Sequence, residues 1–291
     1  MLTEDLKTFL SRRLSQLLSG SVHIEEVKRV SGGSINVALQ LIADTGDQFF
    51  LKINDADLYP GLFERERLGL ESLGQFVRTP IVLMEEVYEN KQLLVMEWIS
   101  PGTRTEKFWK DFGAKLALLH QQTGSCFGLN YDNFMGSLKQ ANGWRETWVE
   151  FFRSQRLEPQ VKMAADSGLL PAQWVGRFEN LYKALPSIFP EEKPGLLHGD
   201  LWSGNFMCTR QQEPVLIDPA IYYGHRAVDL GMTTLFGRCS QDFYEAYHYH
   251  FPLEKNYEEQ WEVANLYPLM IHLNLFGGGY LEGVREVLKQ F

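Results

Sequence analysis

Two carboxylates and a side-chain amide lie close together in the sequence, within residues 200–218. Asp200 and Asn205 share one glycine-containing loop, and Asp218 ends a short apolar run that follows it. Phosphoryl transfer needs a carboxylate near the attacking hydroxyl group and oxygen ligands for Mg²⁺. The spacing HGDxxxxN, with an apolar-apolar-Asp sequence downstream, is typical of a phosphotransferase catalytic loop. The alternative is a turn in which Asp200 and Asn205 only cap backbone amides.

A lysine in an apolar strand is the second candidate for chemistry. Lys52 lies in the alternating run QFFLKIN, which predicts a β-strand. A phosphate ligand and a carboxylate partner would explain a lysine in such a half-buried strand, whereas a solvent-facing lysine is the simpler alternative. The charged helix expected over residues 61–73 offers Glu66 as the preferred partner and Glu64 as the second choice.

Two further segments could contact a nucleotide through their backbone. Gly32, Gly33 and Ser34 lie between two β runs, where glycines let backbone amides approach phosphates. The same residues also suit an ordinary hairpin turn, and the sequence has neither a Walker loop nor a dinucleotide-binding fingerprint. At the end of a later strand, the backbone of Glu97 and Ile99 could face the edge of an adenine ring.

The elements expected along the chain form two unequal lobes. Residues 23–99 read as short β runs interrupted by a single helix, with an amphipathic helix over residues 3–18 before them. Further along, helical spacing dominates. Helices are expected there over residues 105–120, 146–157, 172–185, 226–237, 241–249, 257–274 and 279–290. We therefore predict an α+β chain with a nucleotide-binding lobe over 1–99 and a larger, mostly helical lobe for catalysis and substrate binding over 100–291. A cleft between two such lobes is a natural ligand site.

The overall composition limits the classes of partner and the cellular setting that the protein could have. The 291 residues carry a formal net charge of −9, and nucleic acid is a poor partner because its phosphates need clustered Lys and Arg. No stretch of about 20 apolar residues is present, which disfavours a membrane span. Three cysteines without CxxC spacing favour a reduced, cytoplasmic setting. Nothing in the sequence indicates the oligomeric state, so a monomer is the default expectation.

Taken together, these motifs resemble those of the kinase-like small-molecule phosphotransferases, the group that holds aminoglycoside and choline kinases. The closer resemblance is to the fructosamine kinase family, which includes ketosamine-3-kinases, and it spans nearly the whole chain. The segments that carry it are GGSIN (32–36), FLKIN (50–54), FERERLGL (63–70), DNFMGS (132–137), NGWRETWVEFFRSQRLEPQ (142–160), HGDLWSGN (198–205), IDPAIYYGHRAVDLGMTTLFG (217–237) and HLNLFGGGY (272–280). The last four distinguish this family from the broader group.

The resemblance implies a bilobal protein-kinase-like fold and ATP-dependent phosphorylation of the 3-hydroxyl group of a ketoamine, the sugar adduct that glycation leaves on amines. It also implies a repair role, because the 3-phosphate makes the adduct prone to elimination. By residue, it implies that Asp200 is the catalytic base and that Asn205 and Asp218 bind Mg²⁺. It implies further that Lys52 binds the ATP phosphates and pairs with Glu66.

The glycine-rich segment and two aromatic residues complete the expected site. The resemblance implies that Gly32, Gly33 and Ser34 cover the phosphates. Trp202, two residues after the expected base, could stack against the sugar or could be a buried aromatic residue that supports the loop. His272 could also face the substrate.

Other functions stay open at this point. The chain could phosphorylate another alcohol, such as an aminoglycoside, choline or homoserine, and its acidic charge is compatible with a cationic drug. It could instead bind nucleotides without catalysis, which the intact set of candidate catalytic residues disfavours. Regulated protein kinase activity is disfavoured because Gly199 stands where such kinases carry an arginine. His225 could be catalytic, but we expect it to make a structural hydrogen bond, and Asp229 could hold the catalytic loop instead.

Overall fold

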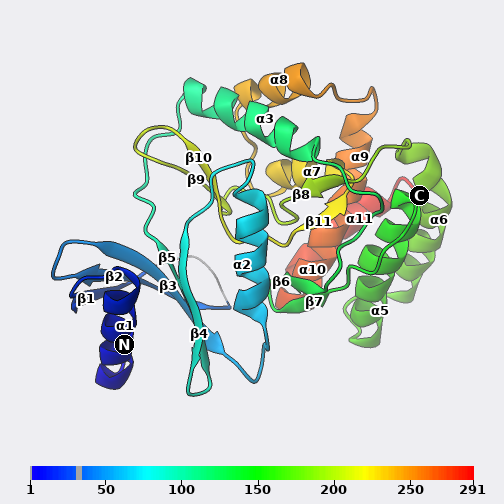
Figure 1. The fold of residues 1–291 in the computed structure, drawn as a ribbon. Helices are drawn as coiled ribbons and strands as arrows, with labels where there is room; N and C mark the ends of the chain where they lie inside the picture. The colour runs from blue at the N-terminus through cyan, green and yellow to red at the C-terminus, as the bar shows by residue number, and fades with distance from the viewer. Residues whose placement is uncertain (1, 31–34) are drawn as a thin grey trace.

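The computed structural model describes residues 2–30 and 35–291, so the predicted phosphate contacts of Gly32, Gly33 and Ser34 lie outside the described residues. The first part of the chain forms a five-stranded antiparallel sheet in the order β1-β2-β3-β5-β4, with α1 before it and α2 between β3 and β4 (Figure 1). These elements are α1 (Glu4–Leu17), β1 (Ile24–Arg29), β2 (Val37–Ala43), β3 (Gln48–Asp55), α2 (Leu62–Leu73), β4 (Val82–Tyr88) and β5 (Lys91–Glu97).

The alternation of side chains along the central strands gives this sheet two buried faces. In β5, Leu93 and Val95 belong to the apolar cluster that includes α1, whereas Leu94 and Met96 pack with α2. The register of β3 and β5 places Lys52 directly opposite Leu94, on the face that α2 covers. The period of the strand therefore carries the lysine side chain toward α2 instead of toward solvent.

The second part of the chain is mostly helical, with three short two-stranded ribbons among the helices (Figure 1). The helices are α3 (Glu106–His120), α4 (Trp148–Phe151), the π-helical turn η1 (Phe152–Leu157), α5 (Glu158–Asp166), α6 (Ala172–Ile188), α7 (Ala227–Leu235), α8 (Gln241–His250), α9 (Tyr257–Ala264), α10 (Leu266–Phe276), the 3₁₀ turn η2 (Gly278–Tyr280) and α11 (Leu281–Leu288). The ribbons pair β6 (Asn133–Met135) with β7 (Leu138–Gln140), β8 (Gly195–Leu197) with β11 (Tyr222–Gly224), and β9 (Phe206–Cys208) with β10 (Pro214–Leu216).

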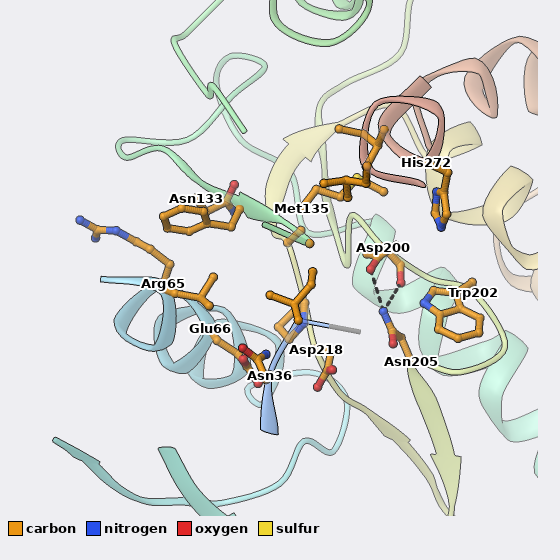
Figure 2. Close-up of a pocket in the computed structure, with 18 of the residues that line it drawn as sticks. Asn36, Arg65, Glu66, Asn133, Met135, Asp200, Trp202, Asn205, Asp218 and His272 are labelled. Atoms are coloured by element: carbon orange, nitrogen blue, oxygen red, sulfur yellow. Dashed lines mark hydrogen bonds between the residues drawn. The ribbon is translucent and has the colours of Figure 1, made fainter. Parts of the chain in front are cut away.

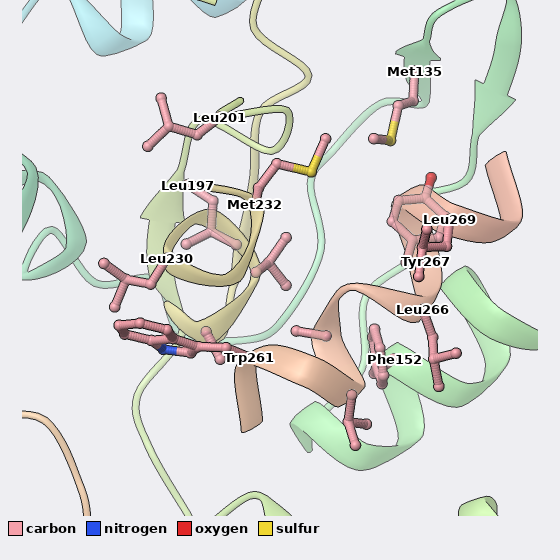
Figure 3. Packing of buried hydrophobic residues seen from close by; sticks show 14 of the residues in the cluster. Met135, Phe152, Leu197, Leu201, Leu230, Met232, Trp261, Leu266, Tyr267 and Leu269 are labelled. Carbon is pink, nitrogen blue, oxygen red and sulfur yellow. The ribbon is translucent and has the colours of Figure 1, made fainter. Parts of the chain in front are cut away.

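The larger apolar core lies in this second part. Leu197 of β8 and Leu201 are fully buried in it, close to Leu230 and Met232 of α7 and to Trp261 of α9 (Figure 3). The loop that begins after β8 is therefore anchored in the core on both sides of its first turn, which fixes the position of the residues between the two leucines.

The helix expected over residues 257–274 is two helices, α9 and α10, that meet at Asn265. Pro268 explains the break, because a proline lacks the N–H group for an intrahelical bond and its ring clashes with the carbonyl four residues earlier. That carbonyl belongs to Ala264, the last residue of α9. Pro268 is tolerated in the first turn of α10, where its missing donor has no helical partner to lose.

The predicted α+β class is confirmed, and the division at residues 99 and 100 stays a prediction. Among the described residues, no helix combines the length and the apolar character that a membrane crossing requires.

Candidate active site

A cavity of about 610 Å³ is lined by residues from both parts of the chain (Figure 2). Its walls come from β3, α2, the β6–β7 hairpin, the loop after β8, the segment after β10, and α10. The candidate residues that line it are Lys52, Glu66, Asp200, Trp202, Asn205, Asp218 and His272. Residues far apart in the sequence thus converge on one space.

Lys52 is the buried cation of this cavity. Its Nζ lies 2.7 Å from Oε1 of Glu66 and 2.6 Å from Oδ1 of Asp218. Burial lowers the pKa of Lys52, but the carboxylates of Asp218 and Glu66 outweigh burial and raise the pKa above its ordinary value. The ammonium group therefore stays charged at neutral pH and joins β3, α2 and the segment after β10.

Asp200 and Asn205 are connected through their side chains. Nδ2 of Asn205 donates to Oδ2 and to the carbonyl oxygen of Asp200, both at 2.9 Å (Figure 2). Because the NH₂ group of Asn205 is bound to Asp200, its amide oxygen is turned away from that residue. Burial, followed by the nearby Asp218 carboxylate, raises the pKa of Asp200 to about 7. This carboxyl group can therefore accept and release a proton near neutral pH.

A buried carboxylate holds the backbone of the loop that carries Asp200. Asp229 of α7 accepts hydrogen bonds from the N–H groups of His198 at 2.7 Å and Gly199 at 2.9 Å, and from Nε2 of His120 at 3.1 Å. Burial alone would raise the pKa of Asp229, but the hydrogen bond and charge of His120, together with His198 and the N–H group of Gly199, outweigh burial and keep the pKa below its usual range. Asp229 therefore holds the loop as a permanent anion, the role expected from the sequence.

The segment after β10 is bound directly to this loop. The N–H group of Ala220 donates to the carbonyl of His198 at 2.9 Å, and Nε2 of His198 donates to the carbonyl of Ile217 at 2.8 Å. Gly199 is required at this contact, because its φ is +85° and a Cβ there would lie 2.1 Å from the carbonyl oxygen of Ala220. Asp218 has a φ of +55°, which is uncommon for a residue with a side chain, and 42% of its side chain is exposed.

Aromatic side chains form the end of the cavity beyond Asp200. Trp202, His272, Phe276 and Tyr280 line it, and Phe236 packs behind them. The ring centres of Phe236 and His272 are 4.9 Å apart, and those of His272 and Tyr280 are 5.0 Å apart. This wall offers flat apolar surfaces and few charged groups.

Two contacts fix the orientation of these rings. The indole of Trp202 lies so close to Gly204 that a Cβ at that glycine would be 2.3 Å from the ring. Nδ1 of His272 donates to the carbonyl of Pro268 at 2.7 Å, and burial lowers the pKa of His272. The imidazole is therefore neutral, with its Nε2 left as a hydrogen-bond acceptor.

The sequence and the fold match known enzymes over nearly the whole chain. The family model described as fructosamine kinase matches residues 6–291. The chain belongs to the fructosamine kinase family. It is 36% identical over 289 residues to the "Probable ketoamine kinase" of Synechocystis sp., which covers 97% of this chain and 95% of the relative. It is 34% identical over 280 residues to the protein-ribulosamine 3-kinase of Arabidopsis thaliana, which covers 93% of this chain and 84% of the relative.

Solved structures extend this fructosamine kinase relationship to the fold. A crystal structure from Thermobifida fusca, described as a "putative fructosamine-3-kinase", has a TM-score of 0.86 at 30% identity and covers 96% of this chain and 97% of that chain. A macrolide 2′-phosphotransferase has a TM-score of 0.66 at 13% identity, covers 99% of this chain and 97% of that chain, and shows the fold alone. The predicted bilobal kinase-like fold is confirmed.

Five of the motifs shared with the family contribute cavity residues to which the sequence interpretation gave no role, and three of them supply polar or sulfur-containing side chains. GGSIN supplies Asn36, FERERLGL supplies Arg65, and DNFMGS supplies Asn133 and Met135. Arg65 stacks over the ring of Tyr131, with 4.7 Å between the guanidinium carbon and the ring centre. These residues could have been found only through the family motifs that contain them, because their residue types alone indicate no chemistry.

Other candidate residues lie outside the cavity. The Glu97 side chain accepts from Arg78 at 2.7 Å and from the backbone N–H of Ile81 at 3.3 Å, and Ile99 is buried. Their backbone contacts with adenine stay a prediction. His225 is buried against the rings of Trp148 and Phe189 and accepts from a backbone N–H group, which fits the structural role expected for it.

Proposed function

We propose that this protein is an ATP-dependent kinase that phosphorylates the 3-hydroxyl group of ketoamines. The observation that carries the proposal is the convergence of Lys52, Asp200, Asn205 and Asp218 on one cavity in a chain of the fructosamine kinase family. The names of the relatives, ketoamine kinase and ribulosamine 3-kinase, support the acceptor class.

The phosphate side of the cavity is built around Lys52. An ammonium group has three donors, and two of them are bound to Glu66 and Asp218. The third is available to a phosphate oxygen of ATP. Glu66 holds the ammonium in place from α2, so the charge is already oriented before phosphate binds. Less conformational entropy is then lost when the phosphate binds.

The donor set at this side fits magnesium carried in by a nucleotide. Among the described residues, no group of three His, Cys, Asp or Glu side chains could hold a metal ion on its own. Mg²⁺ is typically bound by one or two protein oxygens together with substrate phosphates. Asn205 and Asp218 would supply those oxygens, from an amide turned away from Asp200 and from a partly exposed carboxylate. Bound there, the ion would neutralise charge on the phosphates.

Asp200 would act on the acceptor. The 3-hydroxyl oxygen forms a bond to the γ-phosphorus as the bond from that phosphorus to the bridging oxygen of ADP breaks. The hydroxyl proton passes to the Asp200 carboxylate, whose pKa of about 7 makes it a suitable acceptor near neutral pH. Nδ2 of Asn205 keeps the carboxylate oriented throughout.

The aromatic end favours a ketoamine over an aminoglycoside. In the part of the chain that the structure describes, the acidic side chains lining the cavity are Glu66, Asp200 and Asp218, and all three serve the phosphoryl transfer. A drug with several ammonium groups would lack carboxylate partners here. Trp202 and His272 instead offer an apolar ring face and one acceptor nitrogen, which suit the C–H face and a hydroxyl group of one sugar.

The product and the setting follow from the same chemistry. Phosphate on C3 lies next to the C2 carbonyl of the ketoamine, so it can leave by elimination, and the amine is then released from its sugar adduct. We propose a deglycation repair role on this basis. Cys126, Cys208 and Cys239 are unpaired, which supports the cytoplasmic setting that we propose. A monomeric state stays a prediction.

An ATP-consumption assay over a panel of acceptors tests this function. The panel contains fructosamine, ribulosamine and erythrulosamine adducts of lysine, together with an aminoglycoside, choline and homoserine. We expect turnover with at least one ketoamine, with phosphate at O3 as read by NMR, and background rates with the Asp200→Asn enzyme as control. Turnover with an aminoglycoside, choline or homoserine but with no ketoamine would refute the proposal.

A further inference from the structure

Arg156 is a fully buried arginine behind the β6–β7 side of the cavity. Its guanidinium donates to three neutral oxygens: the carbonyl of Ala141, the carbonyl of Gln155 at 3.1 Å, and Oδ1 of Asn142 at 2.7 Å. Among the residues that the structure describes, no carboxylate forms an ion pair with it. Burying a charge without an opposite charge is costly, so an arginine in this place needs a specific reason.

Aromatic rings surround this charge in place of a counter-ion. The guanidinium carbon of Arg156 lies 4.0 Å from the ring centre of Tyr222, 4.6 Å from that of Phe151, and 5.3 Å from that of Tyr267. The faces of aromatic rings attract cations, and the attraction is stronger away from water. Rings and carbonyls together hold the planar guanidinium in one orientation, which the point charge of a lysine would not reproduce.

The π-helical turn η1 brings Arg156 to this position. In an α-helix, side chains on one face recur every three or four residues, whereas a π turn adds one residue. The buried pairs along the continuous helix are Phe151 and Phe152, Arg156 and Leu157, then Gln160 and Val161. The first step between pairs is five residues and the second is four, so the extra residue of the π turn is what lets Arg156 face the core. Such turns are frequent at functional sites.

A chain of buried side-chain hydrogen bonds leads from Arg156 to the cavity wall. Asn142, which accepts from the guanidinium, donates through Nδ2 to Oδ1 of Asn133 at 2.9 Å. Asn133 in β6 donates in turn to the carbonyl of Ile221 at 2.8 Å. The guanidinium is therefore two side chains away from the backbone that follows Asp218.

A second branch closes the network. Gln140 of β7 donates to Oδ1 of Asn133 at 2.8 Å and to the carbonyl of Ala220 at 3.0 Å. Gln140 also accepts from the hydroxyl group of Tyr267 at 2.9 Å, and the ring of Tyr267 is one of the three around Arg156. Removing the guanidinium would thus loosen both branches at once, because one partner of Asn142 and the cation beside Tyr267 would be lost.

The far ends of this network belong to the cavity wall. Asn133, Met135, Gly136 and Ala220 all line the cavity. Gly136 at the tip of the hairpin is so close to Leu275 of α10 that a Cβ there would lie 3.1 Å from the leucine side chain. The wall that Arg156 supports therefore reaches the helix that carries the aromatic end, where the acceptor is proposed to bind.

We infer that Arg156 is a positioning residue for the acceptor, and that it fixes the β6–β7 hairpin and the backbone of Ala220 and Ile221 as one wall against the sugar. This inference rests on the proposed function. The hydrogen bonds described here lead from Arg156 to this wall and not to Lys52 or α2. Loss of the guanidinium should therefore impair use of the acceptor more than binding of the nucleotide.

The test compares Arg156→Met with a matched control in the same helix. Arg156→Met keeps an apolar stem among the rings and removes the guanidinium. Arg153→Met lies one turn earlier and removes an arginine whose side chain is 47% exposed and paired with Glu158. We expect kcat/KM for the ketoamine to fall about 10–100-fold in Arg156→Met, with a raised KM, because displacing a positioned substrate slightly has effects of that size. Arg153→Met should behave as wild type, and the Kd of MgATP, measured by calorimetry, should change less than about twofold in both variants.

Two further measurements decide the remaining outcomes. Arg156→Lys keeps a charge without the planar fork, should show the same selective loss, and takes over as the test variant if Arg156→Met does not fold. Hydrogen–deuterium exchange should be faster over residues 133–140 and 220–222 in the Arg156 variant than in Arg153→Met, and equal over α2. Parallel losses of acceptor use and MgATP affinity, or no loss of acceptor use, would overturn the inference.

Failure of the proposed function has a different signature. If the wild-type protein phosphorylates no ketoamine, the proposed function is wrong, while the exchange measurement still decides whether Arg156 orders this wall. Equal exchange over residues 133–140 in the two variants would overturn the role of Arg156 whatever the acceptor is.

Discussion

Replacing Lys52 by methionine would leave a buried carboxylate without its partner. Glu66 is buried, and its Oε1 lies 2.7 Å from Nζ of Lys52. Breaking a buried ion pair by removing one partner costs about 3–5 kcal/mol, because the remaining charge has lost what compensated its desolvation. Asp218 also loses a partner, but water reaches its side chain, so this adds little. We expect Lys52→Met to lower the free energy of unfolding by about 3 kcal/mol at pH 8 and to abolish ATP turnover.

The sign of the pH dependence follows from the burial of Glu66. Burial raises the pKa of Glu66, and Lys52 partly lowers it again. In the variant the lowering effect is gone, so the folded-state pKa lies well above that of the unfolded chain. Between these two values the folded variant binds more protons than the unfolded chain, and its stability therefore falls as pH rises. The deficit relative to wild type should be smaller at pH 6 than at pH 8.

Urea unfolding followed by circular dichroism at the two pH values measures this deficit. The double variant Lys52→Met/Glu66→Gln is the matched control, because it removes the unpaired charge and leaves a buried amide, which costs about 1–3 kcal/mol. It should recover part of the lost stability at pH 8 without restoring turnover. Equal stability of wild type and Lys52→Met at pH 8, or a deficit that grows toward pH 6, would refute the view of Glu66 as a buried carboxylate that Lys52 neutralises.

Three further predictions concern the chemistry and the acceptor end. Asp200→Asn should keep its MgATP affinity by calorimetry but lower turnover about 10²–10⁴-fold, the scale for loss of a general base; full activity would remove Asp200 from that role. Because the pKa of Asp200 is about 7, kcat/KM of the wild type should fall as the pH is lowered through that value, since a protonated carboxyl group cannot accept the hydroxyl proton. A flat profile from pH 8 to about pH 5.5 would contradict this. Gly204→Ala should raise the KM for the ketoamine and leave that for ATP unchanged, because the new Cβ would lie 2.3 Å from the Trp202 ring and displace it; equal changes in both KM values would argue against a Trp202 contact with the acceptor.

The site residues that were easiest to predict from the sequence are those whose side chains differ in polarity from their neighbours. Lys52 stands out in an apolar alternating strand, and the alternation that makes the strand also directs the side chain toward α2. Of the three glutamates in the helix that follows, the two preferred candidates, Glu64 and Glu66, are two residues and therefore about 200° apart around its axis. Only one can face the sheet: Glu66 is buried beside Lys52, whereas the side chain of Glu64 is 44% exposed beside Arg65.

Features that depend on a break in a regular pattern were not predictable. The helix α5 had no counterpart among the expected helices, because Pro159 reads as a helix end. In the structure Pro159 stands inside a continuous helix, directly after the π turn η1. It cannot donate to the carbonyl of Gln155 four residues earlier, and that carbonyl accepts from the Arg156 guanidinium at 3.1 Å. Periodicity alone cannot predict a turn whose hydrogen bonds are completed by a side chain.

The aromatic wall was predictable only in part for a similar reason. Trp202 and His272 stood out in the sequence, but Phe276 and Tyr280 join them only because of how α10 and η2 pack. His272, Phe276 and Tyr280 follow each other at intervals of four residues, as the residues on any buried helix face do. The local sequence therefore does not show whether such an aromatic residue lines a cavity or packs in the core.

Pro268 does not line the cavity, yet it lies in the first turn of α10, the helix that carries His272 and Phe276, and its carbonyl accepts the hydrogen bond from Nδ1 of His272. A residue with an N–H group at this position could donate to the carbonyl of Ala264 and join α9 to α10 without a break. Any shift of α10 that this caused would move both rings, so acceptor preference could differ between relatives whose cavity residues are the same.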